Sequence, residues 1–391
     1  MVYSFSDRVQ NLKPSAIREI FKYSAHPDYI PLSAGNPAPD AFPVKEIAEI
    51  SQTLLTENPI LALQYGMTEG YPPLLEYLKI NLQKRCLFRE QDTLLITSGA
   101  QQGMDLLTKS VLNRGDTVLC EAPSFIGSLN AFRSYEANLV GLPIEPDGVS
   151  ISALEEALQT NKNIKYFYTI PNFQNPSGVT MSLAKRRQVY ELCRKYHVLI
   201  LEDNPYGDLR FAGEDVPAIK TLDHDGIVVY VGSFSKVVAP GIRVGYVSAP
   251  EELVGKMVVC KQGEDVHTNM WGQIVCHRFM TNYPFEEHLQ KLQSIYRHKA
   301  EILIDALHQY LEPQGITWNS IEGGLFAWCT LPAGIDLVDY TNRALEQKVC
   351  IVPGTAFLTD EKQPCSSFRI NFSTPTDEQL LLGIQRLATL L

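Results

Sequence analysis

The segment 232–246 carries the residues most able to do chemistry. Lys236 follows Ser233 and Ser235 at the end of an apolar, strand-like run. A lysine in that position is a candidate amine nucleophile, although a solvated lysine in a turn explains the same pattern. Arg243 follows seven residues later, after a Pro-Gly turn and at the start of the next predicted strand. Two cations beside two hydroxyl groups at strand ends suit a phosphate group.

Two further polar positions follow predicted strands. Asn175 lies in the segment 168–178, whose two prolines and glycine are also typical of an ordinary turn. Asp203 and Tyr206 follow the apolar run 198–201, where a buried carboxylate is costly unless a cation compensates it. An Asp that caps a helix is the alternative interpretation. Because open α/β sheets bind ligands at the carboxyl ends of their strands, both positions suit a ligand site.

A glycine turn between a strand and a helix is the last candidate element. Gly99 separates the predicted strand 94–97 from the predicted helix 101–112. The first turn of a helix presents N–H groups that suit a phosphate. Neither G-x-G-x-x-G after a strand nor G-x-x-x-x-G-K-[ST] occurs in the chain, which disfavours a nicotinamide-dependent dehydrogenase.

The composition sets limits on what such a site could serve. The chain has 391 residues, 34 basic and 44 acidic, with a formal net charge of −10 and 45% apolar residues. These values are typical of an ordinary globular protein and argue against nucleic-acid binding. The eight cysteines form no C-x-x-C pair, so we expect reduced thiols in a cytoplasmic protein, with no metal site and no disulfides. No secretory signal or membrane-length apolar run is present, so we expect no membrane partner.

Short apolar runs alternate with amphipathic stretches between residues 93 and 250. This alternation predicts βαβ units and a mainly parallel sheet covered by helices on both faces, hence an α/β fold. The predicted strands are 94–97, 117–120, 139–142, 165–170, 198–201, 227–231 and 243–247. The predicted helices are 101–112, 125–134, 152–159 and 183–196.

The pattern changes after residue 284. One long helix is predicted over 285–311, and a smaller α+β unit follows it. The predicted parts are an N-terminal segment over 1–45, a large domain over 46–284 and a small domain over 285–391. The N-terminal segment is proline-rich and too short to fold alone. We expect it to pack on the small domain and the active site, after a short helix near 15–23.

Seven short motifs accompany or contain these residues. They lie at 33–39, 63–70, 98–102, 121–125, 322–326, 352–357 and 368–373. With them, the sequence resembles the fold-type-I pyridoxal-phosphate (PLP) aminotransferases of class I/II, and within that class the 2-aminoadipate/kynurenine branch. The resemblance covers nearly the whole chain. It implies PLP as cofactor, a mainly parallel seven-stranded sheet in the large domain, and a homodimer with shared active sites.

The resemblance assigns the chemistry around the cofactor ring to four side chains. Lys236 would form the Schiff base with PLP and then shuttle the proton between the substrate α-carbon and the cofactor. A buried Asp203 would keep the pyridine nitrogen protonated, which would also offset the cost of burying this carboxylate. Asn175 and Tyr206 would hydrogen-bond the phenolic oxygen of the cofactor.

The resemblance also implies a phosphate site and a ring-stacking residue. The phosphate site comprises Gly99, Ala100, Gln101, Ser233, Ser235, Arg243 and, from the neighbouring subunit, Tyr65. Ala100 stands where relatives often have serine, so only main-chain donors are expected there. Phe125 would stack on the ring where relatives usually carry tyrosine, so stacking is kept and any hydroxyl contact is lost.

The remaining assignments concern the substrate. Arg369, in a predicted strand of the small domain, would bind the α-carboxylate as a bidentate clamp with help from Asn175. A surface salt bridge is the alternative role for this arginine. Arg18 and Gly35 match the arginine and the glycine beside the substrate side chain in the 2-aminoadipate/kynurenine branch. The alternative for Arg18 is a position on a helix surface without a ligand.

These assignments imply an aminotransferase that moves an amino group from an L-amino acid to a 2-oxo acid by a ping-pong mechanism through Lys236. The expected donor is of the 2-aminoadipate, aromatic or branched-chain type, and 2-oxoglutarate is the usual acceptor. A β-lyase or decarboxylase is an alternative, because the cofactor site does not itself choose which bond breaks. A PLP-binding sensor domain of a transcription regulator is another. Such regulators carry a winged-helix segment ahead of the fold, and we expect none here because the fold begins near Ser15.

We predict that Arg18→Ala raises the KM for 2-oxoglutarate or 2-aminoadipate more than the KM for leucine or an aromatic donor. A mobile guanidinium can pair with a second carboxylate and swing away from an apolar side chain. The expected difference is about five- to thirty-fold, or roughly 1–2 kcal/mol. Steady-state kinetics over a panel of donors measures it. Equal losses for dicarboxylic and apolar substrates would contradict the assignment.

Overall fold

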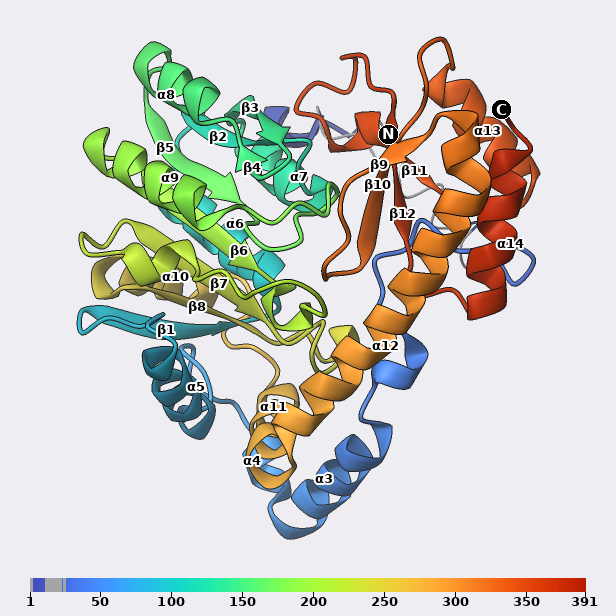
Figure 1. Ribbon diagram of the computed structural model, residues 1–391. Helices are drawn as coiled ribbons and strands as arrows, with labels where there is room; N and C mark the ends of the chain where they lie inside the picture. Colours follow the sequence, from blue (N-terminus) through green and yellow to red (C-terminus); the bar gives the residue numbers. More distant parts are fainter. Residues whose placement is uncertain (1–2, 11–22, 24–25) are drawn as a thin grey trace.

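The computed structural model describes residues 3–10, 23 and 26–391. In these residues the chain forms two sheets, and one long helix runs past both of them (Figure 1). All eight cysteines lie in the described part, and none of them forms a disulfide. Among the described helices, none combines the length and the apolar character that crossing a bilayer requires.

The larger sheet has eight strands in the order β1-β8-β7-β6-β5-β2-β3-β4. They are β1 (Asp92–Thr97), β2 (Thr117–Ala122), β3 (Asn138–Glu145), β4 (Gly148–Val149), β5 (Ile164–Thr169), β6 (Leu199–Asn204), β7 (Val228–Ser233) and β8 (Gly245–Pro250). The strands from β7 to β3 pair in parallel, and β8 is antiparallel to both β7 and β1. The predicted mainly parallel sheet is confirmed. The sheet has eight strands and not the expected seven, because the two-residue strand β4 pairs with β3 at the edge.

Helices cover both faces of this sheet. Along β5, Tyr166 and Tyr168 join one hydrophobic cluster, and Phe167 between them joins another. The helices in the first cluster include α6 (Ala100–Val111), α7 (Ile126–Ser134) and α10 (Glu251–Gln262); those in the second are α8 (Ile151–Thr160) and α9 (Leu183–Lys195). Because successive side chains point to opposite faces, the strand is apolar on both sides, and this is why it appears as a continuous apolar run in the sequence.

The smaller sheet is antiparallel, with the order β11-β12-β10-β9. Its strands are β9 (Thr317–Trp318), β10 (Phe326–Thr330), β11 (Val352–Pro353) and β12 (Ser367–Asn371), and its helices are α13 (Leu337–Glu346) and α14 (Asp377–Ala388). The long helix α12 (Phe285–Ala306) packs on α14. The predicted helix 285–311 is confirmed as far as Ala306, and a π-helical turn continues it to Leu311. Pro313 and a left-handed Gly315 then prevent further helix.

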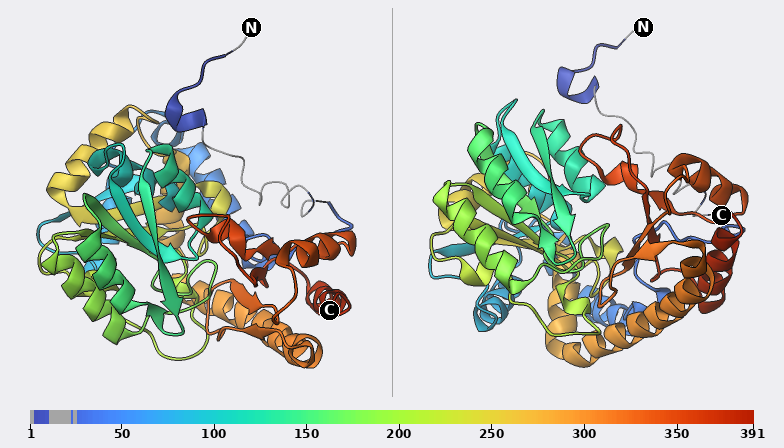
Figure 2. Two further views of the ribbon diagram at one scale, coloured as in Figure 1. Left: turned by 90° about the horizontal axis from the view of Figure 1, so that it is seen from above. Right: turned by 45° about the horizontal axis from the view of Figure 1, so that its top comes forward.

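The N-terminal third supplies the other described helices. They are α1 (Asp7–Gln10), α3 (Val44–Glu57), α4 (Pro59–Leu63) and α5 (Pro72–Lys84), with α11 (Met270–Asn282) packed against α3, α4 and α5. The helix α1 lies against α7 (Figure 2). Ile30 forms a β-bridge with Val349, and the Asn371 N–H donates to the Leu32 carbonyl at 2.7 Å. Residues around Leu32 therefore lie beside the smaller sheet. The helix predicted near 15–23 lies outside the described residues, apart from Tyr23.

Candidate active site

Three neighbouring parallel strands bring the predicted site residues together. Asn175 follows β5, Asp203 lies near the end of β6 and Lys236 follows β7. The N-terminal segment and the smaller sheet complete the arrangement. Lys236 Nζ donates to the Gly35 carbonyl at 2.7 Å, and Arg369 Nη1 donates to Asn175 Oδ1 at 2.8 Å. Residues from four distant parts of the sequence thus meet at one end of the larger sheet.

Arg369 is a buried cation on β12, with 3% of its surface exposed. Its Nη2 donates to the Ser33 carbonyl at 2.7 Å, and its guanidinium lies over the rings of Phe326 and Phe357, 4.2 and 4.9 Å from their centroids. Its Nε has no hydrogen-bond partner, and no carboxylate of the described residues pairs with it. Burial lowers the pKa of Arg369 to about 10. The predicted role as a carboxylate clamp fits this geometry, since a carboxylate ligand would provide the missing counter-charge.

Lys236 lies in a positive environment. Burial, together with the positive charges of Arg369 and Arg243, lowers the pKa of the Lys236 amine to about 8. An amine with a lowered pKa is more often neutral near physiological pH, and only the neutral form is a nucleophile. The structure therefore supports the reactive interpretation of Lys236 over that of a solvated lysine.

Asp203 is the second buried charge of the site, with 3% of its surface exposed. Its Oδ2 accepts a hydrogen bond from the Tyr168 hydroxyl at 3.0 Å, and its Oδ1 has no partner among the described residues. Burial raises the pKa of Asp203 to about 7, although the bond from Tyr168 opposes that rise. An unpaired buried carboxylate oxygen is costly, so this position fits a ligand that brings a positively charged N–H group.

Asn175 links the two charged regions. Its Oδ1 accepts from Arg369, and its Nδ2 lies 3.5 Å from the Tyr206 hydroxyl. Tyr206 is 5% exposed, and its ring packs edge-on against Phe326. Burial raises the pKa of the Tyr206 hydroxyl, which therefore keeps its proton and can donate it in a hydrogen bond.

The predicted phosphate site forms at the start of α6. Gly99 has a φ of 79°, and a side chain there would collide with the guanidinium of Arg243. Arg243 Nη2 donates to the Ser98 carbonyl at 3.1 Å, and its Nη1 donates to Ser235 Oγ at 3.3 Å. The exposed arginine thus lies beside Ser98 and Gly99, directly before the N–H groups of Ala100 and Gln101 that open α6. A helix start with a cation beside it can bind an anion.

Arg243 does not lie in a strand, contrary to the sequence prediction. It follows the 3-10 turn Pro240–Ile242 and has a φ of 57°, and β8 begins two residues later. The tight Pro-Gly turn reverses the chain, and the left-handed residue after it redirects the backbone into β8. This conformation sends the guanidinium toward Ser98 and not along the sheet.

The other predicted site residues differ in how they relate to this group. Ser233 Oγ accepts from the Ser235 N–H at 3.2 Å and also lines a separate cleft, whereas Ser235 Oγ accepts from Arg243. Phe125 is half-buried at the start of α7. Tyr65 is 81% exposed, with its ring edge against His267. Arg18 lies outside the described residues.

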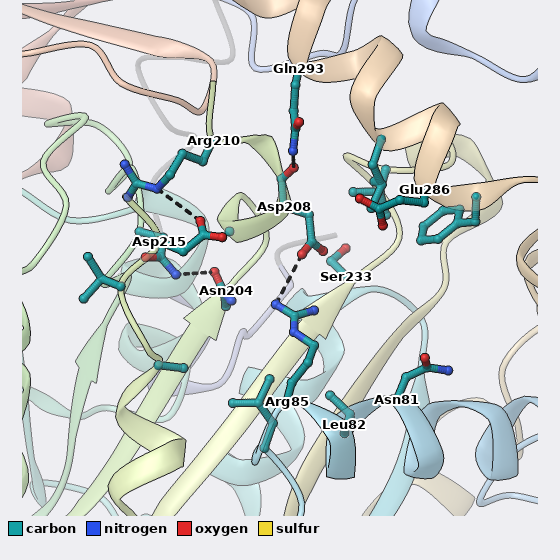
Figure 3. A pocket seen from close by; sticks show the side chains of 18 of the residues that line it. Asn81, Leu82, Arg85, Asn204, Asp208, Arg210, Asp215, Ser233, Glu286 and Gln293 are labelled. Carbon is teal, nitrogen blue, oxygen red and sulfur yellow. Dashed lines mark hydrogen bonds and ion pairs between the residues drawn. The ribbon is translucent and has the colours of Figure 1, made fainter. Parts of the chain in front are cut away.

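The separate cleft has a volume of about 850 Å³ and lies among α5, α12 and the loop after β6 (Figure 3). In it the Asp208 carboxylate pairs with Arg85 at 3.2 Å, and the Asp208 carbonyl accepts from Gln293 of α12 at 3.1 Å. Neither Lys236 nor Asn175 lines this cleft. Its contacts instead hold the loop that carries Tyr206. This cleft is therefore not where the reactive side chains gather.

Tyr168 is a site residue that the sequence reasoning missed. Besides donating to Asp203, its hydroxyl accepts from Ser128 Oγ of α7 at 2.8 Å. The sequence contains one indication of its role, a tyrosine hydroxyl within an otherwise apolar strand. A buried hydroxyl needs a hydrogen-bond partner. Which partner it finds depends on the register of β5 against β6, which the sequence does not show.

Comparison with known proteins gives consistent results. Residues 27–387 match the family described as aminotransferase class I and II. The aromatic-amino-acid aminotransferase 1 of Thermococcus litoralis is 38% identical over 98% of this chain and 93% of its own. The kynurenine aminotransferase of Pyrococcus horikoshii, solved with PMP, superposes with a TM-score of 0.95 at 37% identity, over 99% of this chain and 96% of its own. The α-aminoadipate aminotransferase of Thermus thermophilus, solved with N-(5'-phosphopyridoxyl)-L-leucine, gives 0.90 at 33%, over the same shares.

We predict that Asp203→Asn stabilises the ligand-free protein while abolishing its function. The folded protein binds a proton at Asp203 up to about pH 7, whereas the unfolded chain releases it near pH 4, so this carboxyl lowers stability progressively as the pH rises from about 4 to 7. Asparagine removes that cost. The expected gain in unfolding free energy is on the order of 4 kcal/mol at pH 8 and approaches zero near pH 4.

Urea unfolding of both ligand-free proteins at several pH values measures this gain. Asp225→Asn, at a half-exposed carboxylate on the protein surface, is the control and should show no comparable rise. A gain that does not change with pH would show that Asp203 carries no raised pKa.

Proposed function

Because this chain belongs to the class I and II aminotransferases, we propose that it transfers the amino group of an L-amino acid to a 2-oxo acid, with 2-oxoglutarate as the acceptor. The proposed donors are aromatic, 2-aminoadipate-type or branched-chain amino acids, on the strength of the names that its relatives carry. The observation that carries the proposal is the buried Arg369 guanidinium, which lacks a counter-ion and is hydrogen-bonded to Asn175. An α-carboxylate has the charge and the two oxygens that this guanidinium can bind.

The residues present fit PLP, the cofactor of this family. Bound PLP supplies an aldehyde that condenses with amines and a ring that accepts the electron pair left at the substrate α-carbon. The unpartnered Oδ1 of Asp203 suits the protonated ring nitrogen, and the turn at Gly99 with Arg243 suits the phosphate. Ser235 and the first N–H groups of α6 complete the proposed phosphate site. Asn175 Nδ2 and the Tyr206 hydroxyl are the proposed donors to the phenolic oxygen.

Each protein side chain then has a defined task. Arg369 and Asn175 bind and orient the α-carboxylate, so the substrate amine is held beside Lys236. Lys236 Nζ attaches the cofactor covalently between turnovers, and once released it takes and returns the α-proton. Its pKa of about 8 leaves more of the amine neutral near pH 7 than an ordinary lysine has. The Phe326 and Phe357 rings over Arg369 exclude water and strengthen its pairing with the substrate.

We also propose that the enzyme is a homodimer with shared sites. A run of large apolar side chains on α4 and just after it is exposed: Ile60 by 68%, Leu63 by 73%, Tyr65 by 81% and Met67 by 56%. An exposed apolar patch of this kind is typical of an interface. A second copy packed on it would bring Tyr65 to the phosphate site of its partner. The large domain over 46–284 and the small domain over 285–391 remain our proposed division of each subunit.

The first test of this function concerns Lys236. Borohydride should fix PLP to Lys236 alone, as read by peptide mapping, because burial and two neighbouring cations lower the pKa of this amine beside the proposed cofactor site. Lys236→Ala should lower turnover by about a thousandfold or more, since it removes the general base. Amino-group transfer should also depend strictly on an added 2-oxo acid. Labelling of another lysine, or product formation without an acceptor, would contradict the proposal, and the latter would indicate a lyase or decarboxylase.

The second test concerns Tyr65. We expect Tyr65→Phe to weaken PLP binding by about 1.5–3 kcal/mol, because it removes one hydrogen bond to a charged group. Equilibrium dialysis of the ligand-free variants measures the affinity, and light scattering measures the mass in solution. Tyr3→Phe, at another exposed tyrosine, is the control. A fully active monomer would rule out a shared site.

A further inference from the structure

Glu121 is a buried carboxylate to which the proposed mechanism gives no task. It lies near the end of β2 and is 2% exposed. Its Oε1 accepts from Thr169 Oγ1 at 2.6 Å, and its Oε2 accepts from the Ile170 N–H and from Gln174 Nε2, both at 3.2 Å. Burial, and to a smaller extent the nearby Asp203, raise the pKa of Glu121 to about 7, and the three donors oppose that rise.

The side-chain and main-chain polar groups of Gln174 all have hydrogen-bond partners. Its Nε2 also donates to the Pro123 carbonyl at 2.8 Å, and its Oε1 accepts from the Ser177 N–H at 2.8 Å. Its main-chain groups bond to Val179 and Gly178. Since the side chain is 2% exposed, water cannot replace any of these bonds. The position of Gln174 is therefore determined by Glu121 and by the turn that follows.

Asn175 is the next residue, and both the oxygen and the nitrogen of its side-chain amide have a partner. Oδ1 accepts from Arg369, and Nδ2 lies toward Tyr206. A rotation of this amide would place an NH₂ group against the guanidinium and remove a donor from the Tyr206 side. These two contacts favour one orientation of the amide, and the backbone of Gln174 and Asn175 determines where the amide lies between them.

We propose that Glu121 and Gln174 form a positioning pair that fixes the Asn175 amide, and through it the carboxylate clamp and the hydrogen bond to the cofactor's phenolic oxygen. Glu121 touches neither substrate nor cofactor in this proposal; it acts through Gln174. The proposal rests on the role given to Asn175 under the proposed function. It adds a buried carboxylate from a strand that otherwise contributes nothing to the site.

The chemistry of the pair explains why a carboxylate stands at position 121. Three N–H or O–H donors converge on its two oxygens, and a carboxylate can accept all of them. In Glu121→Gln, one oxygen becomes an NH₂ group that faces another donor. On the Oε2 side that NH₂ group opposes two buried donors and displaces Gln174, and on the Oε1 side it takes the Thr169 hydroxyl as acceptor and leaves the hydroxyl hydrogen unpaired.

Glu202 provides a matched control. It pairs with Thr169 in the register of β5 and β6, is fully buried, and accepts from the Ile219 and Lys220 N–H groups at 2.8 and 2.7 Å. It differs from Glu121 in having no bond to the segment that carries Asn175. Glu202→Gln therefore tests the general cost of removing a buried carboxylate.

The decisive readout is the pH midpoint of the visible absorption band of the bound cofactor, measured in the holoenzymes of Asn175→Ala, Glu121→Gln and Glu202→Gln. A donor to the phenolic oxygen favours its anionic form, so losing that donor raises the midpoint. We expect Asn175→Ala and Glu121→Gln to raise it by about half a pH unit or more, and Glu202→Gln to leave it within about 0.2 units. The Tm should fall in both glutamate variants.

Each result decides the question. A shift in Asn175→Ala without one in Glu121→Gln would overturn the positioning role alone, and equal shifts in both glutamate variants would do the same. No shift in Asn175→Ala would overturn the role of Asn175 itself, and the positioning proposal with it. If Glu121→Gln does not fold, Gln174→Met takes its place, because it removes the same link while leaving the Glu121 carboxylate. An unchanged midpoint in that variant would overturn the pair.

Discussion

The burial of the Arg369 cation without a counter-ion is the constraint on which the rest of the site depends. The guanidinium is held by the Ser33 carbonyl, by Asn175 and by two aromatic rings, so it joins the N-terminal segment, the loop after β5 and the smaller sheet. Because none of these partners is an anion, the charge is stabilised only in part. The site is therefore prepared for a carboxylate, and its positive field also lowers the pKa of Lys236.

Asp203 and Lys236 show the opposite effects of the same burial. Desolvation raises the pKa of the carboxyl to about 7 and lowers the pKa of the amine to about 8. Neither has an ionic partner in the described residues. A ligand that carries an anionic phosphate and a cationic ring nitrogen offsets both costs at once. The ligand-free protein is thus less stable because of the groups that we propose for cofactor binding.

The sequence predicts the sheet and the strand-end residues well, because both depend on local patterns. Apolar runs mark buried strands, and Asn175, Asp203 and Lys236 each interrupt or follow one of them. Arg243 shows what local patterns miss: its left-handed conformation comes from a turn and not from strand propensity. Glu121 and Tyr168 show the same limit, because their partners are set by strand register and side-chain direction. Whether Ser233 faces the site or the neighbouring cleft likewise depends on the pleat of β7.

The two faces of the larger sheet differ in what they connect. The hydrophobic cluster beneath α8 and α9 contains none of the proposed catalytic residues, whereas the cluster on the other face continues into the smaller sheet through residues such as Phe326 and Phe368. Substitutions under α8 and α9 can therefore alter packing without altering the site. A change of side-chain volume in this half of the core acts first on the free energy of unfolding, so this is the half in which heat resistance can be altered with the least effect on the chemistry.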